Sequence, residues 1–285
     1  MNIINNLVFV IIIYIMGAMA YNQSFKAITY NMKNDGATIV ILDIIAGLFS
    51  LLLIPLFDIK FPSSITVYLF LFIACIFYAL NDRIATTARK GLEASTFSML
   101  KQLSTVFMIF AGLIVFREKF ILNKFIGAIL IVIGNIIVFF DKKKLVFNKY
   151  GLYGFIACLF TTVALLIDVS YSKEFNIAFY VSFILIIPAL LILIFERIKF
   201  KTIKSEFNNI NKKLLLINTI GSAIMIVAKL HAYNIGKVTI VAPLCSLTII
   251  TNVFASYFIL GEKKRLPQKV LAAIIIFLSL ILIRL

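Results

Sequence analysis

Ten long runs of mostly apolar residues constrain this chain more than any other feature. The hydrocarbon core of a bilayer, roughly 30 Å thick, needs about 20 such residues in a helix. With 62% hydrophobic and 14% charged residues, the chain has too little polar material to cover a soluble surface of this size. The sequence therefore predicts an all-α integral membrane protein with ten transmembrane helices. The expected spans are 5–22, 37–57, 64–85, 94–116, 120–140, 151–171, 177–195, 214–235, 238–260 and 266–284.

Composition also argues against several other classes of protein. The formal net charge of +16 does not indicate nucleic-acid binding, because the basic residues lie between the apolar runs, where they meet water and lipid headgroups. Cys75, Cys158 and Cys245 all fall inside apolar runs, and no Cys or His has a ligand-like neighbour, so we expect no disulfide, metal or other cofactor. The first run has neither a basic start nor a small-residue cleavage site, so we expect a retained helix and not a signal peptide.

The basic residues are distributed unevenly between the two sides of the predicted bundle. Loops after odd-numbered runs hold 18 of the 28 Lys and Arg residues, and the other side holds 7. The positive-inside rule then places both termini outside the cytoplasm. The longest connection, 196–213, is rich in Asn and Lys and suggests a short surface helix or a solvated tether.

Residues 91–140 return in outline at 236–284, as a long apolar helix, a charged turn and a second apolar helix. Aligning Glu118-Lys119 with Glu262-Lys263 defines the repeat. The chain therefore divides into five-helix halves at 1–140 and 151–285, joined by a linker at 141–150. Because five is odd, the second half enters the membrane from the opposite side, which predicts two inverted repeats.

The charged turns carry a resemblance to a known family. Ile259-Leu260-Gly261-Glu262 fits its Gly-Glu turn, and Val115-Phe116-Arg117-Glu118 departs from it by an Arg in place of the usual Gly. With ten helices in two halves, the chain resembles the drug/metabolite transporter superfamily, EamA type. The resemblance implies alternating access around a cavity lined by helices 1–4 and 6–9, with helices 5 and 10 at the periphery. It also implies cytoplasmic termini, the opposite of what the charge count predicts.

Charged side chains inside the apolar runs are the leading site candidates, because a charge in lipid is costly unless it is paired or hydrated. The deepest are Asp43, Lys101, Asp168 and Lys229, which the resemblance places around the cavity. Other interpretations stay open. The lysines could snorkel to the headgroups, Asp168 could bridge to a nearby lysine, and Asp43 could pair with a lysine or bind a cation or proton.

Polar and aromatic residues on the same predicted helices extend the candidate site. A polar face surrounds Lys101, two tyrosines share a face of the first helix, and a hydroxyl and amide stripe follows the ninth. Such patterns also occur where membrane helices pack closely or where Tyr lies at the interface. The predicted substrate-binding residues are Tyr14, Tyr21, Asp43, Lys101, Gln102, Thr105, Asp168, Lys229, Thr248 and Asn252.

Three further residues are candidates for gating or coupling. Asp82 and Arg83 end the third run, where they form either a gate or a polar helix terminus. His231 is the only histidine and titrates near neutral pH, although it also suits a plain interfacial role.

Together these features predict a secondary transporter for a small polar organic solute, such as an amino acid or related metabolite, in the plasma (inner) membrane. No GxxxxGK[ST] run is present, so direct ATP driving is not expected. Protons could couple through Asp43, Asp168 or His231. The alternatives are an integral membrane enzyme acting on a lipid-linked substrate, which would need clustered acids, and a structural or receptor-like bundle, which would need no charges on several cavity helices.

Overall fold

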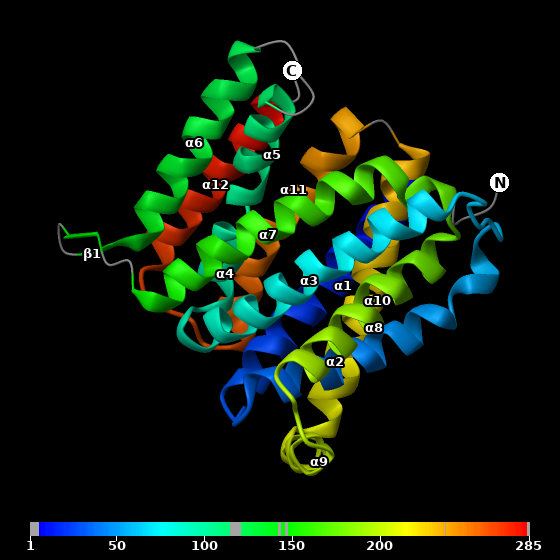
Figure 1. The fold of residues 1–285 in the computed structure, drawn as a ribbon. Helices are drawn as coiled ribbons and strands as arrows, with labels where there is room; N and C mark the ends of the chain where they lie inside the picture. The colour runs from blue at the N-terminus through cyan, green and yellow to red at the C-terminus, as the bar shows by residue number, and fades with distance from the viewer. Residues whose placement is uncertain (1–5, 115–120, 142–143, 146–147, 237, 284–285) are drawn as a thin grey trace.

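The structure, a computed structural model, describes residues 6–114, 121–141, 144–145, 148–236 and 238–283. These residues form a helical bundle with one minimal hairpin of two-residue strands (Figure 1). In chain order the elements are α1 (Leu7–Thr29), α2 (Asp35–Leu51), η2 (Ile54–Leu56), α3 (Ile65–Gly91), α4 (Ala94–Leu100), α5 (Leu103–Ile114), α6 (Leu122–Phe139), β1 (Phe140–Asp141), β2 (Lys144–Leu145), α7 (Lys149–Tyr171), η3 (Ser172–Glu174), α8 (Ile177–Phe195), α9 (Phe200–Asn209), α10 (Lys212–Ile235), α11 (Val238–Ile259) and α12 (Leu266–Leu282).

Asparagine side chains begin many of the long helices. Each accepts hydrogen bonds from backbone N–H groups of the first turn, which have no partner inside the helix. The Asn34 side chain, for example, accepts from the Ala37 amide at 2.7 Å. The residues that cap in this way are Asn6 before α1, Asn34 before α2, Asn148 before α7, Asn176 before α8 and Asn211 before α10.

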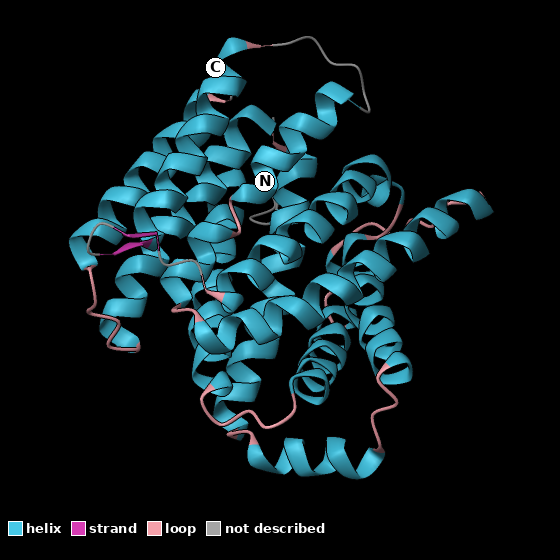
Figure 2. Cartoon of the chain, turned by 60° about the vertical axis from the view of Figure 1, so that its left-hand side comes forward, coloured by secondary structure: helices cyan, strands magenta, loops and turns pink. Residues whose placement is uncertain are grey.

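The two halves of the chain pack against each other throughout the bundle. Helix α1 lies along α10, α2 along α8, α3 along α7 and α6 along α12 (Figure 1). Figure 2 shows the bundle from a second direction, with the two short strands in magenta at one side. Gly17 and Gly221 allow the close approach of α1 and α10, because a Cβ atom on Gly17 would lie 2.9 Å from the backbone nitrogen of Met225. Any site at the middle of the bundle is therefore built from both halves.

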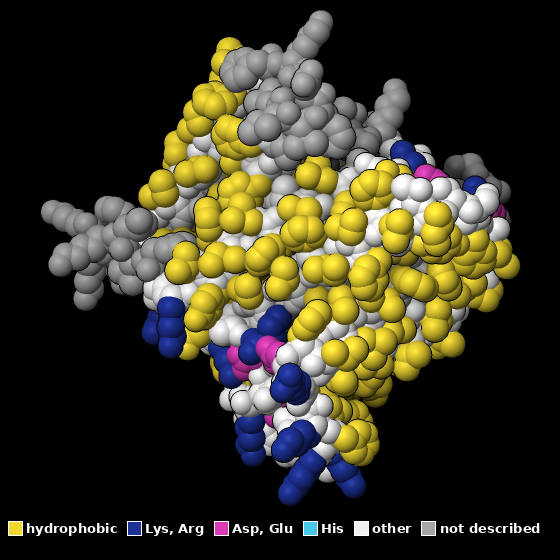
Figure 3. All heavy atoms as spheres, in the orientation of Figure 1, with side chains coloured by type: hydrophobic (Ala, Val, Ile, Leu, Met, Phe, Trp, Pro, Cys, Tyr) yellow, Lys and Arg dark blue, Asp and Glu magenta, His cyan; other side chains and the backbone are white. Residues whose placement is uncertain are grey.

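Six of the described helices are long and apolar enough to cross a membrane: α1, α3, α6, α7, α8 and α10. Helix α12 and part of α11 are apolar but shorter. Apolar side chains cover much of the face seen in Figure 3, and Lys and Arg gather at the end that carries α9. This distribution suits a protein whose sides contact lipid.

The structure corrects the predicted spans 94–116, 5–22 and 64–85. The expected single helix 94–116 is interrupted at Lys101–Gln102, where the Thr105 amide bonds to the Gln102 carbonyl, three residues back. Helices α1 and α3 also run past 22 and 85, so Lys26, Arg89 and Lys90 lie in helices and not in loops. The Lys26 ammonium donates to the carbonyls of Arg89 and Lys90, which gives it a partner at the end of α3.

Of the two alternatives stated for 196–213, a short surface helix or a solvated tether, the structure shows a helix, α9. The second charged turn also has a clear structural role. The buried Glu262 carboxylate accepts hydrogen bonds from the Ala94 amide at 2.6 Å and the Ser95 hydroxyl at 2.7 Å, at the start of α4. A carboxylate is favourable there because helix N-termini carry partial positive charge. Glu118, in the first turn, lies outside the described residues.

Candidate functional site

Lys101 lies at the break between α4 and α5, in the middle of the bundle. Its ammonium donates to Asn81 Oδ1 on α3 at 2.9 Å and to Thr161 Oγ1 on α7 at 2.5 Å. The Thr161 hydroxyl also donates to Asn81 Oδ1, at 2.6 Å. The structure therefore directs Lys101 toward two neighbouring helices, α3 and α7. Its hydrogen-bonding partners here are neutral groups.

Two carboxylates, Asp43 on α2 and Asp82 on α3, lie close enough to influence each other electrostatically. Asp43 is buried, and its Oδ2 atom has no hydrogen-bond partner among the described residues. Asp82 accepts a hydrogen bond of 2.6 Å from the Asn81 side-chain amide, whose oxygen accepts the hydrogen bond from Lys101. Lys101 and Asp82 attract each other. A buried carboxylate oxygen without a partner is costly, so the Asp43 carboxyl is a natural place for a ligand or a proton.

Asp168 on α7 is buried and accepts hydrogen bonds from two tyrosines. The Tyr180 hydroxyl of α8 donates to Oδ1 at 2.6 Å, and the Tyr78 hydroxyl of α3 donates to Oδ2. Lys229 of α10 lies within electrostatic range of both Asp168 and Lys101. The described residues show no direct bridge from Asp168 to a lysine, so the tyrosines are its immediate partners.

Arg89 of α3 belongs to the same charged region. It lies beyond the predicted end of the third span, residue 85, and was therefore expected in a loop. Only 8% of it is exposed, and its guanidinium carbon lies 4.9, 4.6 and 4.2 Å from the ring centres of Tyr21, Phe25 and Phe97. A cation over aromatic faces is stabilised by the negative charge density of the rings. Arg89 also lies within electrostatic range of Asp82 and Lys101. The spacing from Asp82 to Arg89, seven residues on one helix face, is the signal that could have found it.

The polar stripe of α11 reaches the bundle interior as predicted, but it contacts polar residues of neighbouring helices. Asn252 donates to Ser98 of α4 at 3.1 Å, and its Oδ1 atom has no hydrogen-bond partner in the described part of the chain. One turn later, Ser256 meets Gln23 of α1 at 3.3 Å. Ser98 and Gln23 were not among the predicted residues: Gln23 lies one residue past the predicted first span, 5–22, and Ser98 has several polar neighbours in sequence, so neither was distinctive.

Tyr14 of α1 and Thr248 of α11 also lie where these two helices meet, in more apolar surroundings. The Tyr14 ring packs among buried Val10, Ile11 and Cys245, and its hydroxyl approaches Thr248. Thr248 donates to the backbone of its own helix at 2.8 Å. This pair closes the contact between α1 and α11.

Gln102 and Thr105 are partly exposed beside the helix break. In the ranges the structure describes, neither side chain joins the hydrogen bonds around Lys101.

Arg83 has different partners from its neighbour Asp82, which bonds to Asn81. Its Nε atom pairs with Glu196 at the end of α8, and Nη1 lies 3.7 Å from Asp35 at the start of α2. Lys90 pairs with Asp35 as well. We call Asp35, Arg83, Lys90 and Glu196 the end cluster. It ties α2, α3 and α8 together.

His231 lies near the C-terminal end of α10. It is buried, and its ring meets the edge of Phe57 with the centres 4.9 Å apart.

We give the name central network to a set of residues that interact through hydrogen bonds or electrostatically: Tyr21, Asp43, Asn81, Asp82, Arg89, Lys101, Thr161, Asp168 and Lys229. It brings three carboxylates and three cations together from α2, α3, α7, α10 and the α4–α5 break. The described residues contain no group of three or more His, Cys, Asp or Glu side chains that could hold a metal ion. The arrangement is suited to binding a solute that carries charges of both signs or several hydrogen-bonding groups.

Residues 7–140 match the model of the EamA-like transporter family, which lies in the drug/metabolite transporter superfamily. No curated protein matches the chain. The family match and the six long apolar helices together indicate a multi-pass membrane protein.

Proposed function

Because the first half of this chain, residues 7–140, belongs to the EamA-like transporter family, we propose that the protein is a secondary transporter that moves a small polar organic solute by alternating access. An amino acid or a related metabolite is the class of solute that we favour. The proposal places the protein in the plasma (inner) membrane, where it acts without a cofactor.

The observation that carries the proposal is the balanced charge of the central network. A zwitterion presents one carboxylate and one ammonium group a few atoms apart, and the network offers Arg89 or Lys101 for the former and Asp43 or Asp82 for the latter. Charges buried in a membrane bundle are retained for a function more often than for stability, because each is costly to desolvate.

We further propose ten membrane spans in two inverted repeats, 1–140 and 151–285, joined by 141–150. Counting α4 and α5 as one span and leaving out the surface helix α9, a half-turn that exchanges the halves would exchange α1 with α7 and α3 with α10. It would convert the α1–α10 pair into the α7–α3 pair, and it would map the α2–α8 and α6–α12 pairs onto themselves. These are the pairs that pack together. Asparagine caps precede α1 and α2 in one half and the corresponding α7 and α8 in the other.

In this mechanism the central network forms the solute site, and the two ends of the bundle open in turn. The break at Lys101–Gln102 interrupts the helix at this site, as in the broken helices of other transporter folds, and the Lys101 ammonium there reaches Asn81 of α3 and Thr161 of α7. The end cluster closes one side through Arg83. Asp43, whose Oδ2 atom is unpartnered, is the residue that we assign to proton coupling, with Asp82 beside it.

Transport by purified protein in liposomes tests this function. We expect a labelled solute from an amino-acid and metabolite panel to accumulate without chemical change, and a matching ligand to raise the melting temperature of the detergent-solubilised protein. Lys101→Ala and Asp43→Asn should abolish that ligand-dependent shift. Lys173→Ala and Asp58→Asn, at exposed positions, are the matched controls. A chemical product would support the enzyme alternative, and full ligand shifts in both site variants would refute the site.

A further inference from the structure

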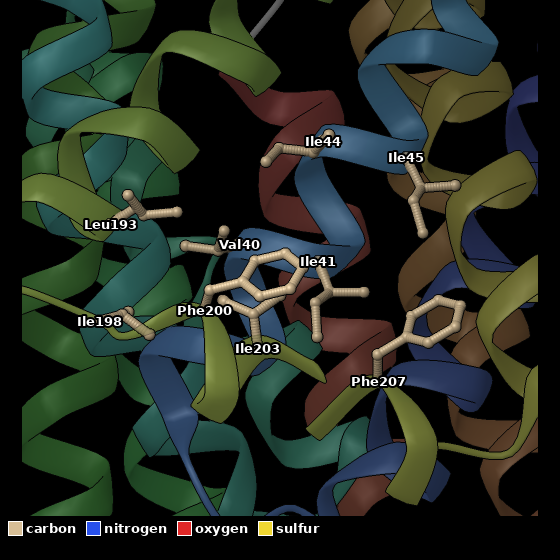
Figure 4. A pocket seen from close by; sticks show the side chains of 9 residues that line it. All are labelled: Val40, Ile41, Ile44, Ile45, Leu193, Ile198, Phe200, Ile203 and Phe207. Atoms are coloured by element: carbon tan, nitrogen blue, oxygen red, sulfur yellow. The ribbon is translucent and has the colours of Figure 1, made fainter. Parts of the chain in front are cut away.

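A cavity lies beneath the surface helix α9 (Figure 4). It has a volume of about 430 Å³, and every residue that lines it is apolar. Helix α2 supplies Val40, Ile41, Ile44 and Ile45, the end of α8 supplies Leu193, Ile198 follows it, and α9 supplies Phe200, Ile203 and Phe207.

Helix α9 is held in place over this cavity, which we call the α9 groove. The buried Glu206 carboxylate accepts hydrogen bonds of 3.0 Å from the Lys33 amide and the Thr38 hydroxyl. Asn209 donates to the Asn31 carbonyl at 2.7 Å. These contacts fix α9 to the α1–α2 connection and to the start of α2. They therefore hold α9 in position over the groove.

The two faces of α9 differ in chemistry. Phe200, Ile203 and Phe207 follow one helical face and line the groove, with Phe200 81% exposed at its rim. Lys201 and Lys204 are exposed to solvent. An amphipathic helix of this kind lies at a membrane surface, with its apolar side toward the acyl chains and its lysines toward the headgroups.

Further positive charge surrounds the groove. The exposed cations of this segment are Arg197, Lys199, Lys201, Lys204, Lys212 and Lys213. In Figure 3, Lys and Arg side chains gather at the end of the molecule that carries α9. The two acids nearby are already engaged, Glu196 by Arg83 and Glu206 by Lys33 and Thr38. The local field is therefore positive and suits an anionic headgroup.

We propose that the α9 groove binds one acyl chain of an anionic phospholipid, with its phosphate placed at Lys201 and Lys204. A polar solute or a peptide backbone would lose its hydrogen bonds to water in the groove and find no partner on the all-apolar lining. A hydrocarbon chain needs none. The lipid would hold α9 against α2, a helix that also carries Asp43 of the central network.

Native mass spectrometry of the full-length protein in detergent tests the proposal. Phosphatidylglycerol and phosphatidylcholine with identical acyl chains are added separately. Wild type is expected to retain one phosphatidylglycerol more tightly than phosphatidylcholine, and Ile45→Trp, which fills the groove, to weaken the binding of both lipids roughly tenfold. The matched control is Ile129→Trp, on an exposed apolar face of α6.

The headgroup contact is tested by the double variant Lys201→Gln/Lys204→Gln. It should lower phosphatidylglycerol affinity roughly tenfold and leave phosphatidylcholine unchanged, because only the anionic lipid gains from the lysines. Both lysines are exposed, so this variant also decides the matter if the tryptophan variant does not fold. Equal retention of the two lipids by wild type, or an equal loss in the Ile129→Trp control, would overturn the proposal.

Discussion

The central network and the end cluster both collect charged side chains from several helices, but they pair them differently. In the end cluster, Arg83 and Lys90 contact the carboxylates of Asp35 and Glu196 directly. In the central network, the Lys101 ammonium bonds to neutral Asn81 and Thr161, and Asp43 Oδ2 has no hydrogen-bond partner in the described ranges. Opposite charges that already meet stabilise a conformation, whereas charges held apart by neutral groups can still be satisfied by a ligand.

The largest effect should follow from removing the cation of the central network. Lys101→Met keeps most of the side-chain length and removes the charge, so solute uptake should fall about tenfold to hundredfold, as expected for a lost charge-assisted hydrogen bond. Initial uptake rates in liposomes measure this. The protein should melt at or above the wild-type temperature, because a buried charge has been removed. Unchanged uptake would show that Lys101 does not contact the solute.

The next largest effect concerns the stability contributed by Asp168. Like the carboxylates of the end cluster, the Asp168 carboxylate already contacts its partners, which are the hydroxyls of Tyr78 and Tyr180. Tyr180→Phe removes one of the two hydroxyl donors to a buried carboxylate, and should lower the free energy of unfolding by about 1–3 kcal/mol. Denaturation of the purified protein measures this. Tyr68→Phe, a partly buried tyrosine on α3, is the control. A loss of uptake with unchanged stability would instead assign Asp168 to the solute.

Breaking the end cluster should have a smaller effect on folding. Asp35→Asn weakens the contacts of Arg83 and Lys90 at the start of α2, and the pairs are partly exposed. We expect a loss of about 1 kcal/mol in stability that diminishes in high salt. Uptake should change less than in Lys101→Met. If Asp35→Asn abolished uptake, the end cluster would belong to the transport site.

The smallest effect is the coupling between Arg83 and Glu196. A double-mutant cycle with Arg83→Gln and Glu196→Gln should give an interaction energy of about 0.5–1 kcal/mol, the range for partly exposed ion pairs. Lys60 and Asp58, an exposed pair 3.5 Å apart, provide a second cycle that should lie nearer zero. Equal values would place the end cluster among ordinary surface pairs.

Much of the bundle could be predicted from the sequence because its signals are local. Long apolar runs mark helices, and the polar segment 196–213 contains α9, one of the two alternatives stated for it. Asp43 and Lys101 could be selected for the same reason, since a charge in an apolar run is visible without any neighbour. The interruption at Lys101–Gln102 was missed because the run 94–116 contains neither Pro nor Gly before Gly112.

The sequence by itself determined that the chain forms apolar helices and that several of them carry charges within the apolar run, such as Asp43 and Lys101. The tertiary structure decided how the charges are satisfied: Arg89 meets three aromatic rings from α1 and α4, Asp168 meets a tyrosine 90 residues away, and Asp43 is left with an unpartnered oxygen. The physical reason is that helical periodicity shows which residues share a face, whereas the partner of a buried charge depends on which distant helix packs against that face.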